Sequence, residues 1–205
     1  NGGKAMAGYL ALLGKRVILY NRTFLHVEVI AERRGVDLIN PGGLEGFGKL
    51  EMVTDNIGDL LAESQVIMVV MPSSAHRDIA KAATPYLRDD HTVILNPGRT
   101  GGALEFTETL RQNGCTTNPI ISEAETFIFA SRSEGPNLAR IFRIKESVPL
   151  AALPANRTKE ALNAIHTAFP QYINGGNVLM TGLNNMGAVF HPALAMLNAG
   201  WIEAT

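Results

Sequence analysis

The stretch NGGKAMAGYLALLGKRVILYNRT, residues 1–23, decides how the fold of this chain is interpreted. Two glycines come first, and an apolar pattern with helical spacing follows, made by Ala5, Met6, Tyr9, Leu10 and Leu13. Gly14 suits the end of that helix, and residues 16–20 then have the pattern of a short buried strand. Glycines, helix and strand in this order form the second half of a dinucleotide-binding unit, which opens with a strand and the motif G-x-G-x-x-G.

Gly3 matches the third glycine of that motif. On this interpretation the first strand and two more glycines precede residue 1, so we expect the sequence to be a fragment. Asn1, Gly2 and Gly3 then lie where a pyrophosphate rests on the amino terminus of a helix, and glycine lets the backbone come close. A plain helix and strand joined by Gly14, with no ligand, remains the alternative.

The composition narrows the class of protein. Hydrophobic residues make up 46% of the 205 and charged residues 18%, which is typical of a globular chain with a core. A net charge of −1 gives no reason to expect nucleic acid or a membrane surface as partner. The single cysteine, Cys115, excludes an intrachain disulfide and a cysteine-based metal site, so we expect no metal and a reducing, cytoplasmic setting.

Strand and helix patterns alternate over the first two thirds of the chain. Residues 66–71 form an uninterrupted apolar run, which is typical of a strand buried on both faces of a parallel sheet. Further strands are expected at residues 92–95 and 119–121. Helices are expected at residues 24–34 (closed by Gly35), 57–63, 102–113 and 157–168, and from Ser73 onward with a serine as N-cap. This alternation predicts an α/β fold with a Rossmann-type doubly wound parallel sheet.

The pattern changes in the last third. Three strand-like segments follow one another closely and predict an antiparallel extension, at residues 127–130, 140–144 and 148–153. From about Asn177 the chain has a helical pattern, interrupted at His191-Pro192. We therefore predict a nucleotide-binding domain over residues 1–175 and the beginning of an all-helical domain over residues 176–205.

Polar or turn-forming residues follow the predicted strands. Ligands of open α/β sheets bind beyond the carboxyl ends of the strands. The residues expected there are Asn21, Arg22, Thr23, Pro72, Asn96, Pro97, Gly98 and Glu123. Any one of these ends could be an ordinary polar loop, but together they favour a nucleotide-binding crevice.

Arg22 indicates which nucleotide is bound. The acidic residue that usually bonds the ribose 2′-hydroxyl of NAD is absent near Asn21. A guanidinium at Arg22, followed by the hydroxyl of Thr23, suits the 2′-phosphate of NADP instead. NADP is therefore the predicted cofactor and NAD the alternative, and a solvated surface arginine without a ligand also stays open.

His191 is the candidate for proton transfer. Of the five histidines, His26, His91 and His166 lie in stretches that have an exposed pattern. His76 lies at a helix start, where capping is expected and a role as a site residue is the alternative. His191 lies in an otherwise apolar segment, where a histidine with a shifted pKa serves as acid or base near neutral pH. A partly buried histidine with its hydrogen bonds satisfied is the alternative.

The longest specific motif is NPGRTGGALEF at residues 96–106. With residues 1–3, Ser122-Glu123, residues 129–134 and residues 191–199, it resembles the octopine/nopaline (opine) dehydrogenase family. The resemblance covers nearly the whole chain and implies a Rossmann-type domain followed by a helical domain, with substrate bound between them. It implies an oxidoreductase that condenses an amino acid with a 2-oxo acid such as pyruvate and reduces the imine with NAD(P)H.

The same resemblance implies residue roles. His191 falls on the catalytic histidine of the family. Members have an asparagine four residues before it, where this chain has Gly187, so Asn184 and Asn185 are the nearby amides expected at the substrate. The catalytic aspartate would lie beyond Thr205, and we expect a chain truncated at both ends to be inactive by itself.

Two other functions stay open at this stage. Dehydrogenases of the glycerol-3-phosphate or 6-phosphogluconate type use a catalytic lysine in the helical domain, and no lysine follows Lys159 in this sequence. A nucleotide-binding sensor without turnover is a different class. The sequence also leaves open which amino acid and oxo acid react, and whether the chain forms a homodimer.

Overall fold

The computed structural model describes residues 2–184 and 186–203. Its α-helices are α1 (Gly2–Leu12), α2 (Glu28–Arg33), α3 (Ile57–Glu63), α4 (His76–Ala83), α5 (Gly102–Gln112), α6 (Thr158–Ile165), α7 (Val178–Leu183), α8 (Met186–Leu197) and α9 (Ala199–Glu203). Its strands are β1 (Ile18–Tyr20), β2 (Gly35–Ile39), β3 (Gly46–Lys49), β4 (Met52–Thr54), β5 (Val66–Val69), β6 (Thr92–Leu95), β7 (Ile120–Ala124), β8 (Phe129–Ser133), β9 (Leu138–Ile144), β10 (Val148–Leu153) and β11 (Tyr172–Asn174). None of these described helices is long and apolar enough to cross a membrane.

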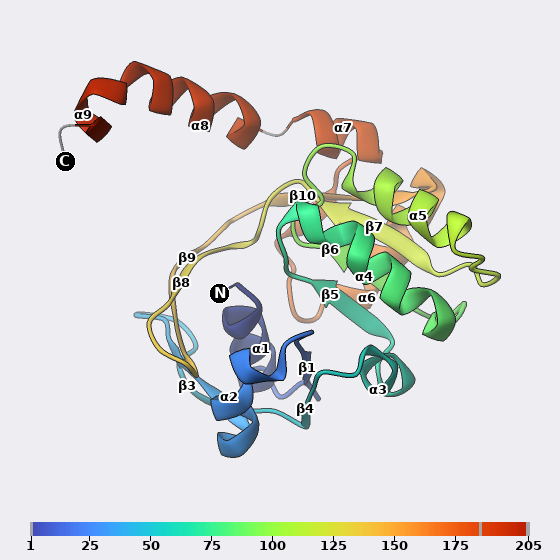
Figure 1. Ribbon diagram of the computed structural model, residues 1–205, viewed down its shortest axis with the longest axis horizontal. Helices are drawn as coiled ribbons and strands as arrows, with labels where there is room; N and C mark the ends of the chain where they lie inside the picture. The colour runs from blue at the N-terminus through green and yellow to red at the C-terminus, as the bar shows by residue number, and fades with distance from the viewer. Residues whose placement is uncertain (1, 185, 204–205) are drawn as a thin grey trace.

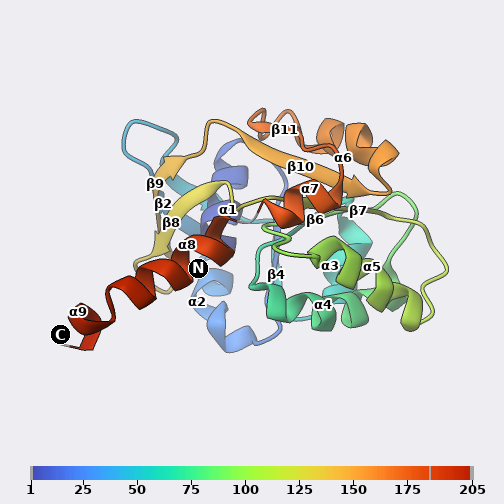
Figure 2. The same ribbon diagram turned by 90° about the horizontal axis from the view of Figure 1, so that it is seen from above.

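The main sheet has five strands in the order β11-β10-β7-β6-β5. Strands β5, β6 and β7 are parallel, β10 runs antiparallel to β7, and β11 is parallel to β10. Helix α6 covers one face of this sheet, whereas α4 and α5 cover the other (Figure 2). Every residue of β6 and β7 is buried between these helix layers. The predicted α/β fold with parallel strands is thereby confirmed.

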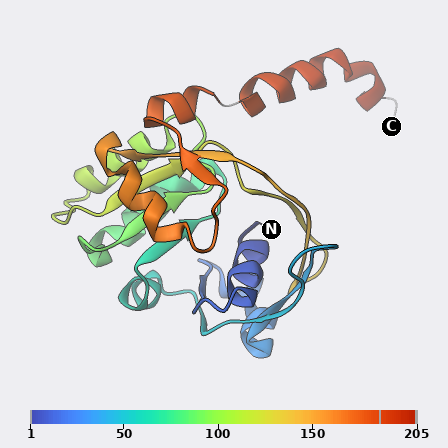
Figure 3. The same ribbon diagram turned by 180° about the vertical axis from the view of Figure 1, so that it is seen from behind.

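A second sheet of four strands, in the order β3-β2-β9-β8, lies beside α1. Strands β8 and β9 form an antiparallel pair, and the long arms of this pair curve from the main sheet around α1 (Figures 1 and 3). The predicted antiparallel extension is therefore present in β8 and β9. The third segment expected in it, β10, instead pairs with β7 and β11 in the main sheet.

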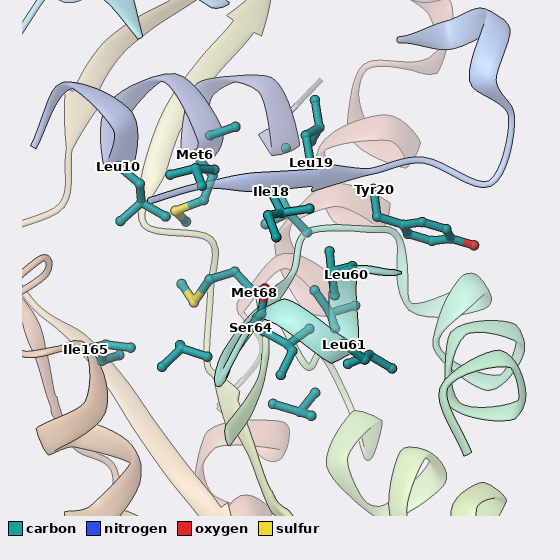
Figure 4. Close-up of a pocket in the computed structure, with 18 of the residues that line it drawn as sticks. Met6, Leu10, Ile18, Leu19, Tyr20, Leu60, Leu61, Ser64, Met68 and Ile165 are labelled. Carbon is teal, nitrogen blue, oxygen red and sulfur yellow. The ribbon is translucent and has the colours of Figure 1, made fainter. Parts of the chain in front are cut away.

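An apolar slot separates the two-stranded ribbon β1–β4 from the edge of the main sheet at β5. Its volume is about 340 Å³, and Figure 4 shows the side chains that line it, including those of Met6, Leu19, Leu60 and Met68. Within the described ranges β5 pairs with β6 alone, and Val66 is 37% exposed. The prediction of a strand buried on both faces is therefore wrong for β5. A further strand lying in the slot would pair with both free edges and cover this surface.

Several predicted helix ends are wrong, each for a local reason. Residues 24–34 form a 3₁₀ turn, Phe24–His26, followed by α2, and Arg34 rather than Gly35 takes the left-handed conformation, with a φ of 53°. Gly35 is instead the first residue of β2, and this position requires a glycine because a Cβ there would collide with the ring of Phe47. Ser73 starts a 3₁₀ turn rather than capping a helix, and α4 begins at His76 without a side-chain cap.

The predicted interruption at His191-Pro192 is also wrong. Pro192 lies inside α8, which continues through it to Leu197. A proline removes one backbone donor and usually bends or breaks a helix, but here the chain bends before α8 and after it. The predicted domain boundary near residue 175 stays a prediction; the chain bends at Asn184, between α7 and α8.

Candidate functional site

Three parallel strands end at one edge of the main sheet, called here the carboxyl edge. Pro72 follows β5, residues 96–98 follow β6, and Glu123 lies near the end of β7. Helix α1 begins close by, since a Cβ on Gly2 would lie only 2.9 Å from Cγ1 of Val70. The structure therefore brings together the glycine pair and the loops that the sequence predicted for a nucleotide.

The start of α1 fits an anion. The first N–H groups of a helix have no partner within the helix and carry its positive dipole end. The first turn of α1 holds no acidic side chain, and a Cβ built on Gly3 would meet nothing within 4 Å. Lys4 is turned aside, because its Nζ donates to Ser133 Oγ at 2.7 Å and to the carbonyl oxygen of Gly135 at 2.7 Å. Asn1, also predicted to lie here, is outside the described residues.

Asn96 holds the turn after β6 and is almost completely buried. Its Oδ1 accepts a hydrogen bond from the Tyr172 hydroxyl at 2.6 Å, and its Nδ2 donates to the carbonyl oxygen of Ile94 at 3.1 Å. Burial raises the pKa of the Tyr172 phenol, which keeps that donor protonated. The peptide bond to Pro97 is cis. The side chain of Asn96 thus faces the protein, and Pro97 and Gly98 follow it at the carboxyl edge.

Glu123 lies behind the same edge and is 1% exposed. Its Oε2 accepts a hydrogen bond from the backbone N–H of Ala103 at 2.8 Å, and its Oε1 accepts one from Thr181 Oγ1 at 2.8 Å. Burial raises the pKa of the Glu123 carboxyl, and the two hydrogen bonds oppose that effect. Gly98 has to be a glycine, because a Cβ there would collide with the Glu123 side chain.

Arg22 follows β1 and extends toward α4. Thr23 and Asn21 form a tight turn in which the Thr23 N–H donates to Asn21 Oδ1 at 3.0 Å. An Arg22 guanidinium nitrogen lies 3.2 Å from a carboxylate oxygen of Asp78, and the two side chains are 70% and 61% exposed. An ion pair this exposed contributes about 0–1 kcal/mol, so Arg22 can exchange Asp78 for a stronger anion.

His191 lies apart from the carboxyl edge, whereas Asn184 lies beside Glu125, the residue that follows β7. The side chain of His191 is exposed on α8, and α8 and α9 project away from the sheets (Figures 1 and 3). Asn184 Nδ2 donates to Glu125 Oε2 at 2.8 Å. Asn184 and Glu125 line a cavity of about 490 Å³ beside α7. Asn185, the other predicted substrate amide, is outside the described residues.

Two histidines are buried that no local sequence pattern marks as buried. His91, predicted to be exposed, is fully buried: its Nδ1 accepts from the Arg88 N–H at 3.0 Å, and its Nε2 lies 3.0 Å from the Leu61 carbonyl oxygen. His76 is also fully buried, and neither of its ring nitrogens has a hydrogen-bond partner among the described residues. It makes no cap, and it packs against Gly102 at the start of α5.

From the burial of these two histidines we predict that the folded chain loses stability at acidic pH. Burial lowers the pKa of His76 and of His91, and the Arg88 charge lowers that of His91 further. Both imidazoles stay neutral in the folded chain, whereas those of the unfolded chain bind protons as the pH falls below about 6.5. Proton binding favours the unfolded chain, so the stability that the neutral histidines contribute is complete above pH 6.5 and is lost as the pH falls. Each histidine contributes at most about 1.4 kcal/mol per pH unit.

Urea unfolding at pH 7 and pH 5 measures this effect. We expect the free energy of unfolding to fall over that interval. We expect His76→Leu to reduce the fall and His166→Ala, at an exposed site, to leave it unchanged. If the free energy of unfolding fell equally between pH 7 and pH 5 in His76→Leu and His166→Ala, burial of His76 would not be the cause of the fall. The Glu123 carboxyl has the opposite effect: because its pKa is raised, the folded chain binds that proton first, and stability increases as the pH falls through its titration.

Comparison with curated proteins gives a relative along the whole chain. It is 38% identical over 204 residues to an opine dehydrogenase of Arthrobacter sp. (strain 1C), covering all of this chain and 56% of that protein. No family model matches the sequence. The chain therefore spans a little over half the length of this relative.

Comparison with solved structures gives the same fold. An octopine dehydrogenase with NADH and pyruvate superposes with a TM-score of 0.82, covering 98% of this chain and 54% of that one at 17% identity. A yersinopine dehydrogenase with NADP⁺ bound superposes with a TM-score of 0.78, covering 95% of this chain and 50% of that one at 17% identity. These two structures therefore show that the chain shares their fold over 95–98% of its length.

Proposed function

We propose that this chain, as a member of the opine dehydrogenase family, binds a nicotinamide nucleotide and serves the reductive condensation of an amino acid with a 2-oxo acid such as pyruvate. The observation that carries the proposal is the 38% identity to an opine dehydrogenase along the entire chain. In this reaction the amino nitrogen attacks the oxo carbon and water leaves. The imine then takes up a hydride at carbon and a proton at nitrogen, which gives a secondary amine with two carboxylates.

The carboxyl edge supports a definite placement of the nucleotide. Its pyrophosphate lies at the start of α1, against Gly2 and Gly3, where the space and the helix dipole suit an anion. The nicotinamide end lies beside Pro72, Pro97 and Gly98, with Asn96 and Glu123 behind them. When bound, the nucleotide supplies the hydride, and the residues of the chain hold and orient it.

His191 and Asn184 serve the substrates in this proposal. His191 exchanges a proton with the substrate nitrogen or oxygen, and Asn184, Asn185 and the cavity beside α7 receive part of the amino acid. NADPH oxidation that requires an amino acid and a 2-oxo acid together tests the function.

The setting and assembly of the protein are part of the same proposal. A cytoplasmic location is supported by the free thiol of Cys115, since unpaired cysteines suit a reducing compartment. The partners are small-molecule acids, and sedimentation of the purified protein would decide whether two copies associate. Cell fractionation would test the location.

Replacing Arg22 by alanine is expected to reduce the preference for NADPH over NADH. A charge-assisted contact to the 2′-phosphate contributes about 1.5–3 kcal/mol, so the ratio of kcat/KM values should narrow roughly tenfold or more. Steady-state kinetics with each nucleotide measures the ratio. An unchanged ratio of kcat/KM values would show that Arg22 does not contact the 2′-phosphate.

Asp78→Asn is the matched control for that experiment. It removes the carboxylate that pairs with Arg22 and leaves the guanidinium in place. NADPH binding should therefore tighten, by up to about fivefold, because the exposed ion pair no longer competes. Weaker NADPH binding in this variant would mean that Asp78 holds Arg22 in its working position rather than competing for it.

A further inference from the structure

A single buried carboxylate connects three elements at the carboxyl edge. Glu123 lies on β7, Ala103 lies in the first turn of α5, and Thr181 lies in α7. The two carboxylate oxygens accept one hydrogen bond from each helix, both of 2.8 Å, and both Glu123 and Thr181 are 1% exposed. We call the Glu123 carboxylate and the Thr181 hydroxyl the Glu123–Thr181 link.

The α5 end of this arrangement fixes the carboxylate. The N-cap residue of α5 is Gly101, with a φ of 77°, and it has no side chain to cap the helix. Oε2 of Glu123 accepts from the Ala103 N–H in its place and adds a negative charge at the positive end of the helix dipole. The carboxylate therefore keeps its position independently of α7.

The α7 end depends on small residues. Helix α7 is six residues long and buries Val178, Thr181 and Gly182. A Cβ on Gly182 would lie 3.3 Å from the Gly101 nitrogen and 3.5 Å from Oε1 of Glu123, so the helix lies directly on the start of α5. Its opposite face is exposed at Leu179 and Met180. So short a helix has little stability of its own, and its contacts hold it in place.

Helix α7 also sets the direction of the chain that follows. It ends at Leu183, and α8, which carries His191, begins three residues later at Met186. Figures 1 and 3 show that α8 continues outward from the place where α7 rests on α5 and β7. The orientation of α7 therefore bears on where the following helix carries His191.

We propose that the Glu123–Thr181 link positions α7 and thereby sets the direction in which the chain leaves the carboxyl edge toward His191. Thr181 is a positioning residue: it acts through Glu123 and α7. Its part in catalysis rests on the proposed function, whereas its hold on α7 does not. A hydrogen bond to a buried carboxylate is stronger than one between neutral groups, which suits it to fix a short helix.

Three variants separate this role from general packing. Thr181→Val keeps the shape of the side chain and removes the donor, so Glu123 still caps α5. Thr181→Ser restores the donor without the methyl group. Glu123→Ala removes both acceptor oxygens and should loosen both helices.

Hydrogen exchange of backbone amides is the first readout. Thr181→Val should raise the exchange rates over residues 178–184 by roughly tenfold or more and leave α5 unchanged, and Thr181→Ser should restore slow exchange. Glu123→Ala should raise the rates in both α5 and α7. Unchanged exchange over residues 178–184 in Thr181→Val, or an equal rise in α5, would overturn the link.

Turnover of the complete gene product is the second readout. Thr181→Val should lower kcat roughly tenfold with an unchanged Kd for NADPH, and Thr181→Ser should recover most of it. A parallel loss of NADPH binding, or no change in kcat, would overturn the positioning role. If the unsubstituted protein does not oxidise NADPH with any amino acid and 2-oxo acid, the proposed function fails, and the exchange measurement still decides whether the link holds α7.

Discussion

Replacing His191 by alanine is expected to lower kcat by about 10²–10⁴, with little change in the Kd for NADPH, because general acid–base catalysis contributes rate factors of this size. The imine cannot form or be reduced without a proton transfer at the substrate nitrogen. A protein group must accept or supply that proton near neutral pH, and an imidazole does so best. The proposed nucleotide site, at the start of α1 and the carboxyl edge, does not include His191, so NADPH binding should be unaffected.

His166→Ala is the matched control for this variant. His166 follows α6 and is exposed, on an element that takes no part in the carboxyl edge. It should retain turnover within a few-fold of the unsubstituted enzyme. Turnover that stays equally high in His191→Ala would assign the proton transfer to another group, whereas loss of NADPH binding in that variant would indicate a structural role for His191.

Replacing Phe169 by alanine is expected to destabilise the chain by about 3–5 kcal/mol, because a fully buried aromatic ring would leave a large cavity. Phe169 is 1% exposed, and its ring centroid lies 5.6 Å from that of Tyr9 and 5.8 Å from those of Phe129 and Tyr172. These partners come from α1, β8 and β11, so this cluster joins both larger sheets to the helix of the glycine pair.

Phe142→Ala provides the comparison for the same chemical change at the surface. Phe142 lies on β9 and is 62% exposed. Its loss should change the free energy of unfolding by no more than about 0.5 kcal/mol. Chemical unfolding of both variants measures the difference. Similar losses from the two would mean that α1 and the sheets do not share one core through Phe169.

The parallel part of the fold could be predicted from the sequence. Thr92–Leu95 is an apolar run bounded by turn residues, and such a run has few alternatives to a strand covered on both faces. The loops at the carboxyl edge followed from the same pattern, since parallel strands end together. Each of these predictions depends only on the residue pattern within one short segment of the chain.

Features that depend on distant neighbours could not be predicted. Val66–Val69 has the same apolar pattern as β6, yet its exposure is set by the slot beside it rather than by its own residues. His91 lies in a polar local sequence, but its ring is buried against the carbonyl oxygen of Leu61, thirty positions away. Thr181 lies 58 positions from Glu123, and no local signal connects them.

The most direct test of the proposed function is an assay of the complete gene product with NADPH, single amino acids and pyruvate, followed by mass spectrometry of the product. We predict that NADPH is oxidised only when an amino acid and the 2-oxo acid are both present. The product should be a secondary amine that combines the two acids with loss of water and gain of two hydrogens. Oxidation of NADPH by the 2-oxo acid alone, with the corresponding hydroxy acid as product, would contradict the account.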